Sequence, residues 1–121
     1  MKFLPDAVTG PSITAYGAGW VAINGEQIHS SVVVSSFGNH FSWNCADYDA
    51  LQAQHFTQLA ELGAELILFG SGAKIRFPQP HWLQALYARQ IGVETMDTQA
   101  ACRTFNFLSG EGRKVVAALL L

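Results

Sequence analysis

The chain has 121 residues, enough for one domain, and half of them are apolar whereas only 13% are charged. This charged fraction is about half of the usual share, which excludes an intrinsically disordered chain and predicts a large buried core. Seven Lys and Arg against nine Asp and Glu give a net charge of −2, so the excess positive charge typical of nucleic-acid-binding proteins is not found.

The cysteines and the apolar runs bear on the compartment of the protein. Cys45 and Cys102 form neither a CxxC pair nor a disulfide framework, which suits a reducing compartment. The longest apolar run, residues 115–121, is too short to cross a bilayer, and the amino terminus lacks the apolar stretch of a secretory signal. We therefore expect a cytoplasmic protein with no transmembrane segment and no nucleic-acid partner.

The first part of the chain shows the alternating pattern of β-strands. After an irregular lead-in over residues 1–12, residues 13–16 and 20–23 predict two short strands. Asn-Gly at positions 24–25 predicts a type I′ hairpin turn, because this turn needs a positive φ at both central positions. Residues 27–35 alternate again with one face largely polar, so we expect this end of the sheet to be half covered.

The hydrophobic period changes from two residues to about 3.6 in the middle of the chain, which predicts an α-helix. Asp47 precedes this helix as its N-cap, and Gly63 follows it as a residue that can adopt a left-handed conformation. The apolar face of the helix consists of Tyr48, Leu51, His55, Leu59 and Leu62.

Two further helices are predicted in the second half of the chain. One begins near Pro80, where the missing N–H costs nothing, and ends at Gly92. The other begins at Asp97 and Thr98, which are the expected N-cap. The inner faces are Leu83, Leu86, Tyr87 and Gln90 in the former helix and Ala101, Phe105 and Leu108 in the latter.

Strands separate these helices and give the fold class. Residues 65–69 form a continuous apolar run, typical of a strand buried on both faces, and residues 93–96 and 114–121 predict two more strands. Strand–helix units after an antiparallel hairpin predict a single α/β domain over residues 1–121 with a mixed sheet. The crossover should be right-handed and should make the first two of these strands parallel.

The parallel arrangement predicts where a binding site would lie. Gly70–Gly72 follows one of the parallel strands and Met96–Thr98 follows the other, so both segments are expected at the carboxyl-terminal edge of the sheet. Crevices at that edge are where open α/β sheets usually bind ligands.

A small anion could bind at this edge, because glycines let backbone N–H groups converge and cationic side chains follow. The candidate ligand-binding residues are Gly70, Ser71, Gly72, Lys74, Arg76, Asp97 and Thr98. The favoured alternative is a tight turn, since the spacing is neither that of a Walker loop nor that of the Rossmann fingerprint. Ser71 is not expected to be a nucleophile, because Phe69 breaks the Gly-x-Ser-x-Gly pattern of hydrolases.

The histidines and cysteines show no metal-ligand spacing, so we expect neither a metal nor a cofactor. His55 lies on an apolar helix face, which predicts a buried, neutral imidazole that shares its proton with a backbone carbonyl. Cys102 follows a helix start, where the helix dipole could lower the pKa of its thiol, but a small buried residue is the favoured interpretation.

The third predicted helix also has an outward-facing pair of residues. Arg103 points away from the core if Ala101 and Phe105 face inward, and Phe107 lies to one side. An exposed Arg beside an aromatic residue is typical of a protein–protein hot spot. The alternative is an ordinary solvated Arg with Phe107 covering the edge of the core, and the sequence alone favours neither.

Several segments of the second half resemble a known family. They are the strand and Gly-x-Gly loop of residues 66–72, the run Met-Asp-Thr at 96–98, the run Ala-Ala-Cys-Arg-Thr-Phe-Asn at 100–106, Leu108, and Glu-Gly-Arg-Lys-Val at 111–115. From about Trp20 to its end the chain is similar to the MTH-nine-three-eight-like domain family, which includes mitochondrial NADH dehydrogenase (complex I) assembly factor 3. Phe105 stands where the family usually has Tyr, and Ser71 where Thr is common.

The resemblance implies a three-layer α/β fold on a mixed, roughly five-stranded sheet. It also implies a non-enzymatic role in assembling a respiratory complex through protein contacts, and an Arg at position 103 belongs to the family pattern. The chain has no Arg-rich targeting segment, so we expect a bacterial member of the family.

These observations predict a protein-binding module without chemistry of its own. The alternative is a protein that binds a small anionic ligand, or a weak enzyme, at the Gly70–Gly72 loop. A third possibility is self-association through the polar face of residues 27–35.

Overall fold

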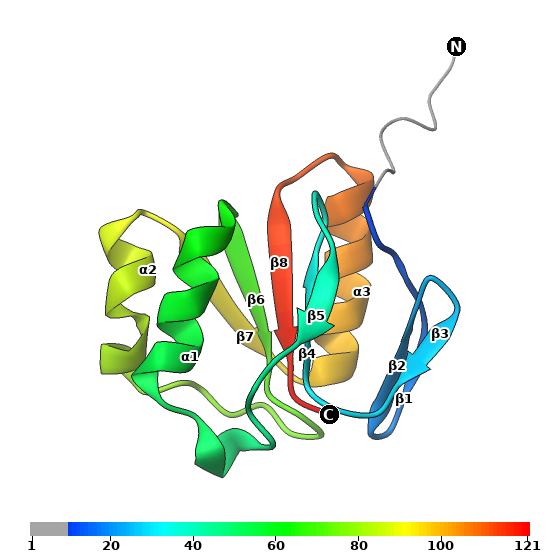
Figure 1. The fold of residues 1–121 in the computed structure, drawn as a ribbon, viewed down its shortest axis with the longest axis horizontal. Helices are drawn as coiled ribbons and strands as arrows, with labels where there is room; N and C mark the ends of the chain where they lie inside the picture. Colours follow the sequence, from blue (N-terminus) through cyan, green and yellow to red (C-terminus); the bar gives the residue numbers. More distant parts are fainter. Residues whose placement is uncertain (1–9) are drawn as a thin grey trace.

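The structure, a computed structural model, describes residues 10–121 and consists of three layers (Figure 1). A central sheet of five strands lies between α1 and α2 on one side and α3 with a smaller sheet of three strands on the other. The elements are β1 (Ile13–Gly17), β2 (Trp20–Ile23), β3 (Glu26–Ile28), β4 (Val32–Ser35), β5 (His40–Ser42), α1 (Ala53–Thr57), β6 (Leu66–Gly70), α2 (Gln84–Ala88), β7 (Gly92–Met96), α3 (Thr98–Gly110) and β8 (Val115–Leu119). The predicted three-layer α/β fold with a mixed sheet and an amino-terminal hairpin is therefore confirmed. Residues 1–9 of the irregular lead-in predicted for residues 1–12 lie outside the described residues.

The central sheet has the strand order β5-β4-β8-β6-β7. Strand β6 is parallel to both β7 and β8, whereas β4 is antiparallel to β5 and β8. The prediction that the strand at 65–69 and the strand at 93–96 run parallel is confirmed. Within residues 10–121, no helix is both long enough and apolar enough to cross a membrane.

The small sheet contains the predicted hairpin. Strands β1, β2 and β3 are antiparallel neighbours, and the turn between β2 and β3 is at Asn24 and Gly25. Their φ angles of 52° and 88° are both positive, as a type I′ turn requires. The sheet is fastened to α3 by Asn106, whose side chain accepts a hydrogen bond from the N–H of Ile13 at 3.1 Å and donates one to its carbonyl at 2.7 Å.

The prediction of one extended strand over residues 27–35 is wrong. The segment divides into β3, in the small sheet, and β4, in the central sheet. Strand β4 is also not half covered, because it lies between β5 and β8 and is buried along its whole length. Val33 packs with the side chains of α1 and α2, while Val32 and Val34 pack with those of α3.

The single helix predicted between Asp47 and Gly63 is also wrong, although its ends are confirmed. Asp47 accepts a hydrogen bond from the N–H of Ala50 and caps a 3-10 turn, and Gly63 has a φ of 80°. Between them the chain is extended at Leu51, forms α1, and continues as a 3-10 turn over Gln58–Leu62. The predicted apolar face survives because its members still point to the core: Leu51, His55 and Leu59 are buried, and Tyr48 and Leu62 are half-buried.

The second predicted helix begins as expected but faces the core differently. Pro80 is at the start of a 3-10 turn over Pro80–Leu83, and α2 follows it. Leu83 and Leu86 are buried, whereas Tyr87 is 55% exposed and Gln90 is exposed, so the inner face predicted for the latter two is wrong. A 3-10 turn has three residues per turn, which rotates the later side chains away from the positions of a regular α-helix. Gln90, with a φ of 59°, ends the helix in place of Gly92, which belongs to β7.

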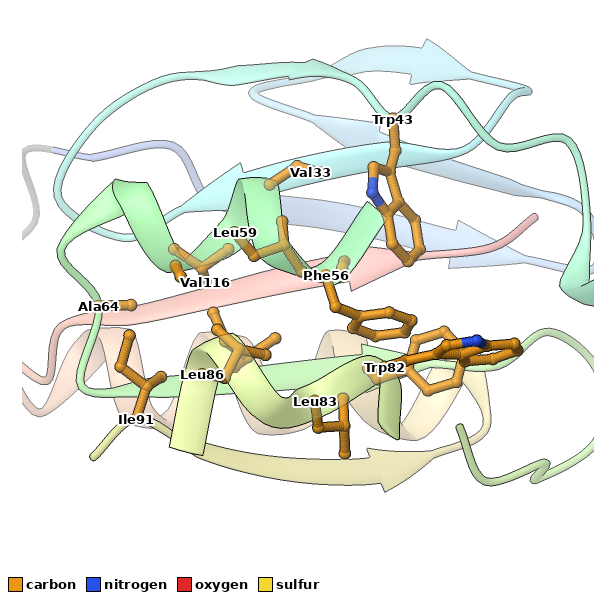
Figure 2. Packing of buried hydrophobic residues seen from close by; sticks show 14 of the residues in the cluster. Val33, Trp43, Phe56, Leu59, Ala64, Trp82, Leu83, Leu86, Ile91 and Val116 are labelled. Carbon is orange, nitrogen blue, oxygen red and sulfur yellow. The ribbon is translucent and has the colours of Figure 1, made fainter. Parts of the chain in front are cut away.

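Aromatic rings dominate the core between the sheet and α1 and α2. The rings of Phe56 and Trp82 are stacked, with centroids 5.9 Å apart, and Figure 2 shows them lying one above the other. Phe56 also meets Trp43 and Phe69 edge to face, at 5.8 and 5.4 Å. Because Phe56 contacts residues from the sheet and from the helical layer, its burial holds these two layers together.

Replacing Phe56 with Ala should therefore lower the free energy of unfolding by about 3–5 kcal/mol, since a buried aromatic side chain leaves a cavity that close packing cannot refill. Phe107→Ala is the matched control, because Phe107 is 65% exposed. Its effect should stay within about 0.5 kcal/mol. Urea denaturation of both variants measures the difference, and equal losses would contradict this account of the core.

Candidate functional site

The two segments predicted to share the carboxyl-terminal edge of the sheet do so. Gly70, the last residue of β6, is in register with Met96, the last residue of β7. Beyond the strands, the N–H of Ser71 donates to the carbonyl of Met96 and the N–H of Thr98 donates to the carbonyl of Gly72, each at 2.9 Å. The glycine turn and the start of α3 therefore form one continuous rim.

The hydroxyl of Thr98 joins three segments at this rim. It accepts a hydrogen bond from the N–H of Gly72 at 2.8 Å and donates one to the carbonyl of Leu120 at 2.7 Å. Leu120 in turn donates its N–H to the carbonyl of Gly70. A Cβ at Gly70 would lie 3.1 Å from the Cα of Thr98 and 2.8 Å from a methyl group of Leu119, so the absence of a side chain lets α3 approach β6 closely.

A hollow of about 360 Å³ lies beside this rim. Its walls are the β1–β2 turn, the glycine turn, the start of α3 and the end of the chain, with lining residues Gly17, Ala18, Gly19, Gly72, Ala73, Asp97, Thr98, Gln99, Leu120 and Leu121. Three of the predicted ligand-binding residues, Gly72, Asp97 and Thr98, therefore line one hollow. Gly70, Ser71, Lys74 and Arg76 are not among its lining residues.

The chemistry of this hollow differs from that of an anion site. Asp97 is the charged side chain among its lining residues, and its carboxylate already caps α3 by accepting the N–H of Ala100 at 3.0 Å. The N–H groups of Ser71 and Gly72 are donated within the chain, so neither is available to a bound anion. In the glycine loop these two N–H groups serve a tight turn.

Ser71 fixes the loop that follows the rim. Its hydroxyl, on a residue that is 5% exposed, donates to the carbonyl of Lys74 at 2.6 Å and accepts the N–H of Arg76 at 2.9 Å. A hydroxyl engaged in this way by backbone groups has a structural role. The expectation that Ser71 is not a nucleophile agrees with this arrangement.

The cationic side chains of the loop are directed elsewhere. The guanidinium of Arg76 lies 3.8 Å from the ring centroid of Tyr48, and one of its nitrogens is 3.7 Å from the carboxylate of Asp49. Lys74 is exposed. The sequence grouped Lys74 and Arg76 with Gly72, Asp97 and Thr98, but in the structure these two cations do not line the hollow.

His55 is the buried, neutral imidazole that the sequence predicts. Its Nδ1 accepts the N–H of Gln52 at 2.9 Å, and its Nε2 is 2.7 Å from the carbonyl oxygen of Asn44. Because a backbone N–H can only donate and a carbonyl can only accept, the proton is on Nε2 and the ring is neutral. Both ring nitrogens are hydrogen-bonded to backbone groups, so His55 has a structural role.

Cys102 is a buried core residue, and the possibility of a reactive thiolate is wrong. Its side chain has no exposed surface, and burial raises the pKa of its thiol to about 12, although the nearby charge of Arg103 lowers it. Burial likewise raises the pKa of the Cys45 thiol. Desolvation outweighs the helix dipole at Cys102, because a thiolate there would have to leave water entirely.

The outer face of α3 presents Arg103 and Phe107 as the sequence predicts. Both are exposed, and they lie four residues apart, so they are neighbours on one helix face. The sequence did not indicate Tyr16, from β1, which contacts Arg103: the guanidinium of Arg103 is 6.0 Å from the ring centroid of Tyr16 and 3.4 Å from its hydroxyl. This neighbour could not be found from local spacing, because it depends on the docking of the small sheet against α3 through Asn106.

The comparisons with known proteins agree with the fold and with the resemblance in sequence. A family model described as "Protein of unknown function (DUF498/DUF598)" matches residues 13–120. The chain belongs to this family. A crystal structure of a Bordetella parapertussis protein is 37% identical to this chain, with a TM-score of 0.87, and the match covers 92% of this chain and 95% of that protein. A Bordetella pertussis protein described as a Mth938-like domain is 32% identical, with a TM-score of 0.79 and coverage of 99% and 92%.

Curated relatives of this DUF498 chain have a name that states a role. Both are named NADH dehydrogenase [ubiquinone] 1 alpha subcomplex assembly factor 3. The Bos taurus protein is 33% identical over 110 residues, which are 89% of this chain and 59% of the relative. The Homo sapiens protein is 32% identical over 117 residues, 95% of this chain and 63% of the relative. The chain thus spans about three fifths of the length of these curated relatives.

The Thr98 hydroxyl gives a direct test of the rim in this DUF498 domain. Thr98→Val keeps the shape of the side chain but leaves the N–H of Gly72 and the carbonyl of Leu120 without their partner. We expect a loss of about 1–3 kcal/mol in the free energy of unfolding, the cost of unsatisfied buried groups. Thr98→Ser, which keeps the hydroxyl, is the control and should lose less. Equal thermal midpoints for the two variants would show that the hydroxyl does not hold the rim.

Proposed function

We propose that this DUF498 chain is a protein-binding module that helps to assemble a multisubunit NADH dehydrogenase and has no chemistry of its own. The observation that supports this most is the extent of the match: relatives named as assembly factors align with 89–95% of the chain. The segment that they share with this chain therefore includes nearly all of its structural elements. A function that the shared domain performs in those relatives would need little beyond what this chain contains.

The buried polar groups also support a binding role over an enzymatic one. The hydroxyls of Ser71 and Thr98, the imidazole of His55 and the thiol of Cys102 are buried side chains of types that take part in enzymatic reactions. The first three are hydrogen-bonded to backbone, and the thiol is held in its neutral form by burial. Each of these groups stabilises the fold.

The surface that we assign to the partner is the outer face of α3, formed by Arg103 and Phe107, together with Tyr16 from the adjacent strand β1. Phe107 is 65% exposed, so a partner that covered it would remove a large apolar surface from water. Arg103 is held beside Tyr16 by a hydrogen bond, which lowers the entropy cost of ordering its long side chain on binding. Arg and aromatic residues are the types that contribute most to binding hot spots.

A second candidate function is the binding of a small ligand in the hollow beside the rim. The hollow lies at the carboxyl-terminal edge of a parallel strand pair, which favours this function. The volume of the hollow is also within the usual range for ligand sites, roughly 300–1,000 Å³. The Asp97 carboxylate favours a neutral ligand over the anion predicted from the sequence. A dose-dependent rise of the thermal midpoint with phosphate or a nucleotide would restore the anionic alternative.

The double substitution Arg103→Ala and Phe107→Ala tests the main proposal. In a host strain that lacks this protein, the wild-type chain should restore the amount of assembled NADH dehydrogenase seen on native gels, and the double variant should not. Tyr87→Ala is the matched control, because Tyr87 is exposed on α2, on the other side of the sheet. The thermal midpoints of both variants should match that of the wild type. Full restoration by the double variant would contradict the assignment of this surface.

A further inference from the structure

The loop between β6 and the turn at Pro80 displays four consecutive exposed side chains: Lys74, Ile75, Arg76 and Phe77. Cations and large apolar side chains alternate in it. Ile75 is 53% exposed, and Phe77, at 67%, is the most exposed of the large hydrophobic side chains of residues 10–121. Exposed apolar side chains of this size, next to one another, are typical of interaction sites.

This loop is fixed in place although its side chains face the solvent. The Ser71 hydroxyl bonds the carbonyl of Lys74 and the N–H of Arg76, and the Tyr48 hydroxyl donates to the carbonyl of Phe77 at 2.6 Å. Pro78, the next residue, is buried. With these contacts at both ends, Ile75 and Phe77 cannot turn inward without breaking hydrogen bonds.

Tyr48 connects the loop to the core. Its ring lies 6.0 Å from that of Trp82, centroid to centroid, and the guanidinium of Arg76 stacks on it at 3.8 Å. The carboxylate of Asp49 pairs with Arg76 from the same 3-10 turn. The loop is therefore held by side chains from a segment more than twenty residues earlier in the chain. A flexible loop loses entropy when it becomes ordered on binding. Because this loop is already ordered in the folded protein, binding does not carry that cost.

The charges of the loop indicate what would complement it. Among the ion pairs of residues 10–121, Lys74 takes part in none, and the side chain of Arg76 is 50% exposed beside Asp49. Because Asp49 already pairs with Arg76, Lys74 is the cation that this loop presents without a carboxylate partner among the described residues. A partner with carboxylates around an apolar pocket would match both the charges and the apolar groups.

We propose that residues 73–77, the docking loop, insert Phe77 and Ile75 into an apolar pocket of a protein partner whose rim has Asp or Glu side chains that pair with Lys74 and Arg76. The proposal rests on the function proposed above and adds a second contact to the outer face of α3. A fluid bilayer accommodates a loop of any conformation, so a fixed backbone brings no particular advantage at a lipid surface. A folded pocket benefits from a loop that already has its bound shape.

Photo-crosslinking in the host tests this docking loop. The photoreactive residue p-benzoylphenylalanine replaces Phe77 in one variant, Phe107 in a second and Tyr87 in a third, and mass spectrometry locates the attachment points. All three positions are exposed, so folding should be unaffected, as the thermal midpoints will show. We expect position 77 to be attached to a protein, at apolar residues with Asp or Glu beside them, and position 87 to give no specific product. Lys74→Glu should reduce the product at position 77 by about tenfold or more, as the loss of a hot-spot contact does.

The outcomes separate this inference from the proposed function. Products at position 107 but not at position 77 would overturn the docking loop and leave the function of the α3 surface in place. No product at either position would overturn both. Attachment of position 77 to phospholipid, or to a protein surface with Lys or Arg around the pocket, would overturn the proposed partner. An undiminished product with Lys74→Glu would do the same.

Discussion

The hydroxyl of Thr98 is the interaction on which the arrangement of this domain depends. It holds the glycine turn after β6, the start of α3 and the segment after β8 in one cluster of hydrogen bonds. Because α3 is fixed at this end, its inner face meets the sheet and its outer face presents Arg103 and Phe107 beside the small sheet. The docking loop leaves from the same rim, where the hydroxyls of Ser71 and Tyr48 fix its backbone.

Several buried polar side chains of this chain form hydrogen bonds to backbone groups, whereas several large apolar side chains are exposed. His55 bonds two backbone groups, Ser71 bonds the docking loop, and Cys102 is a core residue. Phe77 and Phe107, by contrast, are about two-thirds exposed. A fold that is stabilised by its polar groups and displays aromatic ones is suited to binding proteins, which agrees with the name of its curated relatives.

Much of the fold could be predicted from local signals. Asn24-Gly25 predicted the hairpin, Asp97 predicted the start of α3, and the apolar run ending at Phe69 predicted a buried parallel strand. The failures were of longer range. The division of residues 27–35 between two sheets and the interruption of the helix at Leu51 depend on packing between distant segments, which a periodic pattern does not contain. Arg76 was assigned to the rim by its place in the sequence, whereas its actual partner, Tyr48, could be found only in three dimensions.

The central claim is that exposed apolar side chains are displayed from a backbone that the fold holds rigid. Amide hydrogen exchange of the wild-type chain, resolved by NMR, tests it at two N–H groups: that of Gly72, bonded to Thr98, and that of Arg76, bonded to Ser71. If the claim holds, both amides exchange far more slowly than an unstructured peptide, although neighbouring side chains such as Lys74 and Phe77 face the solvent. Exchange of both at the rate of an unstructured peptide would contradict it.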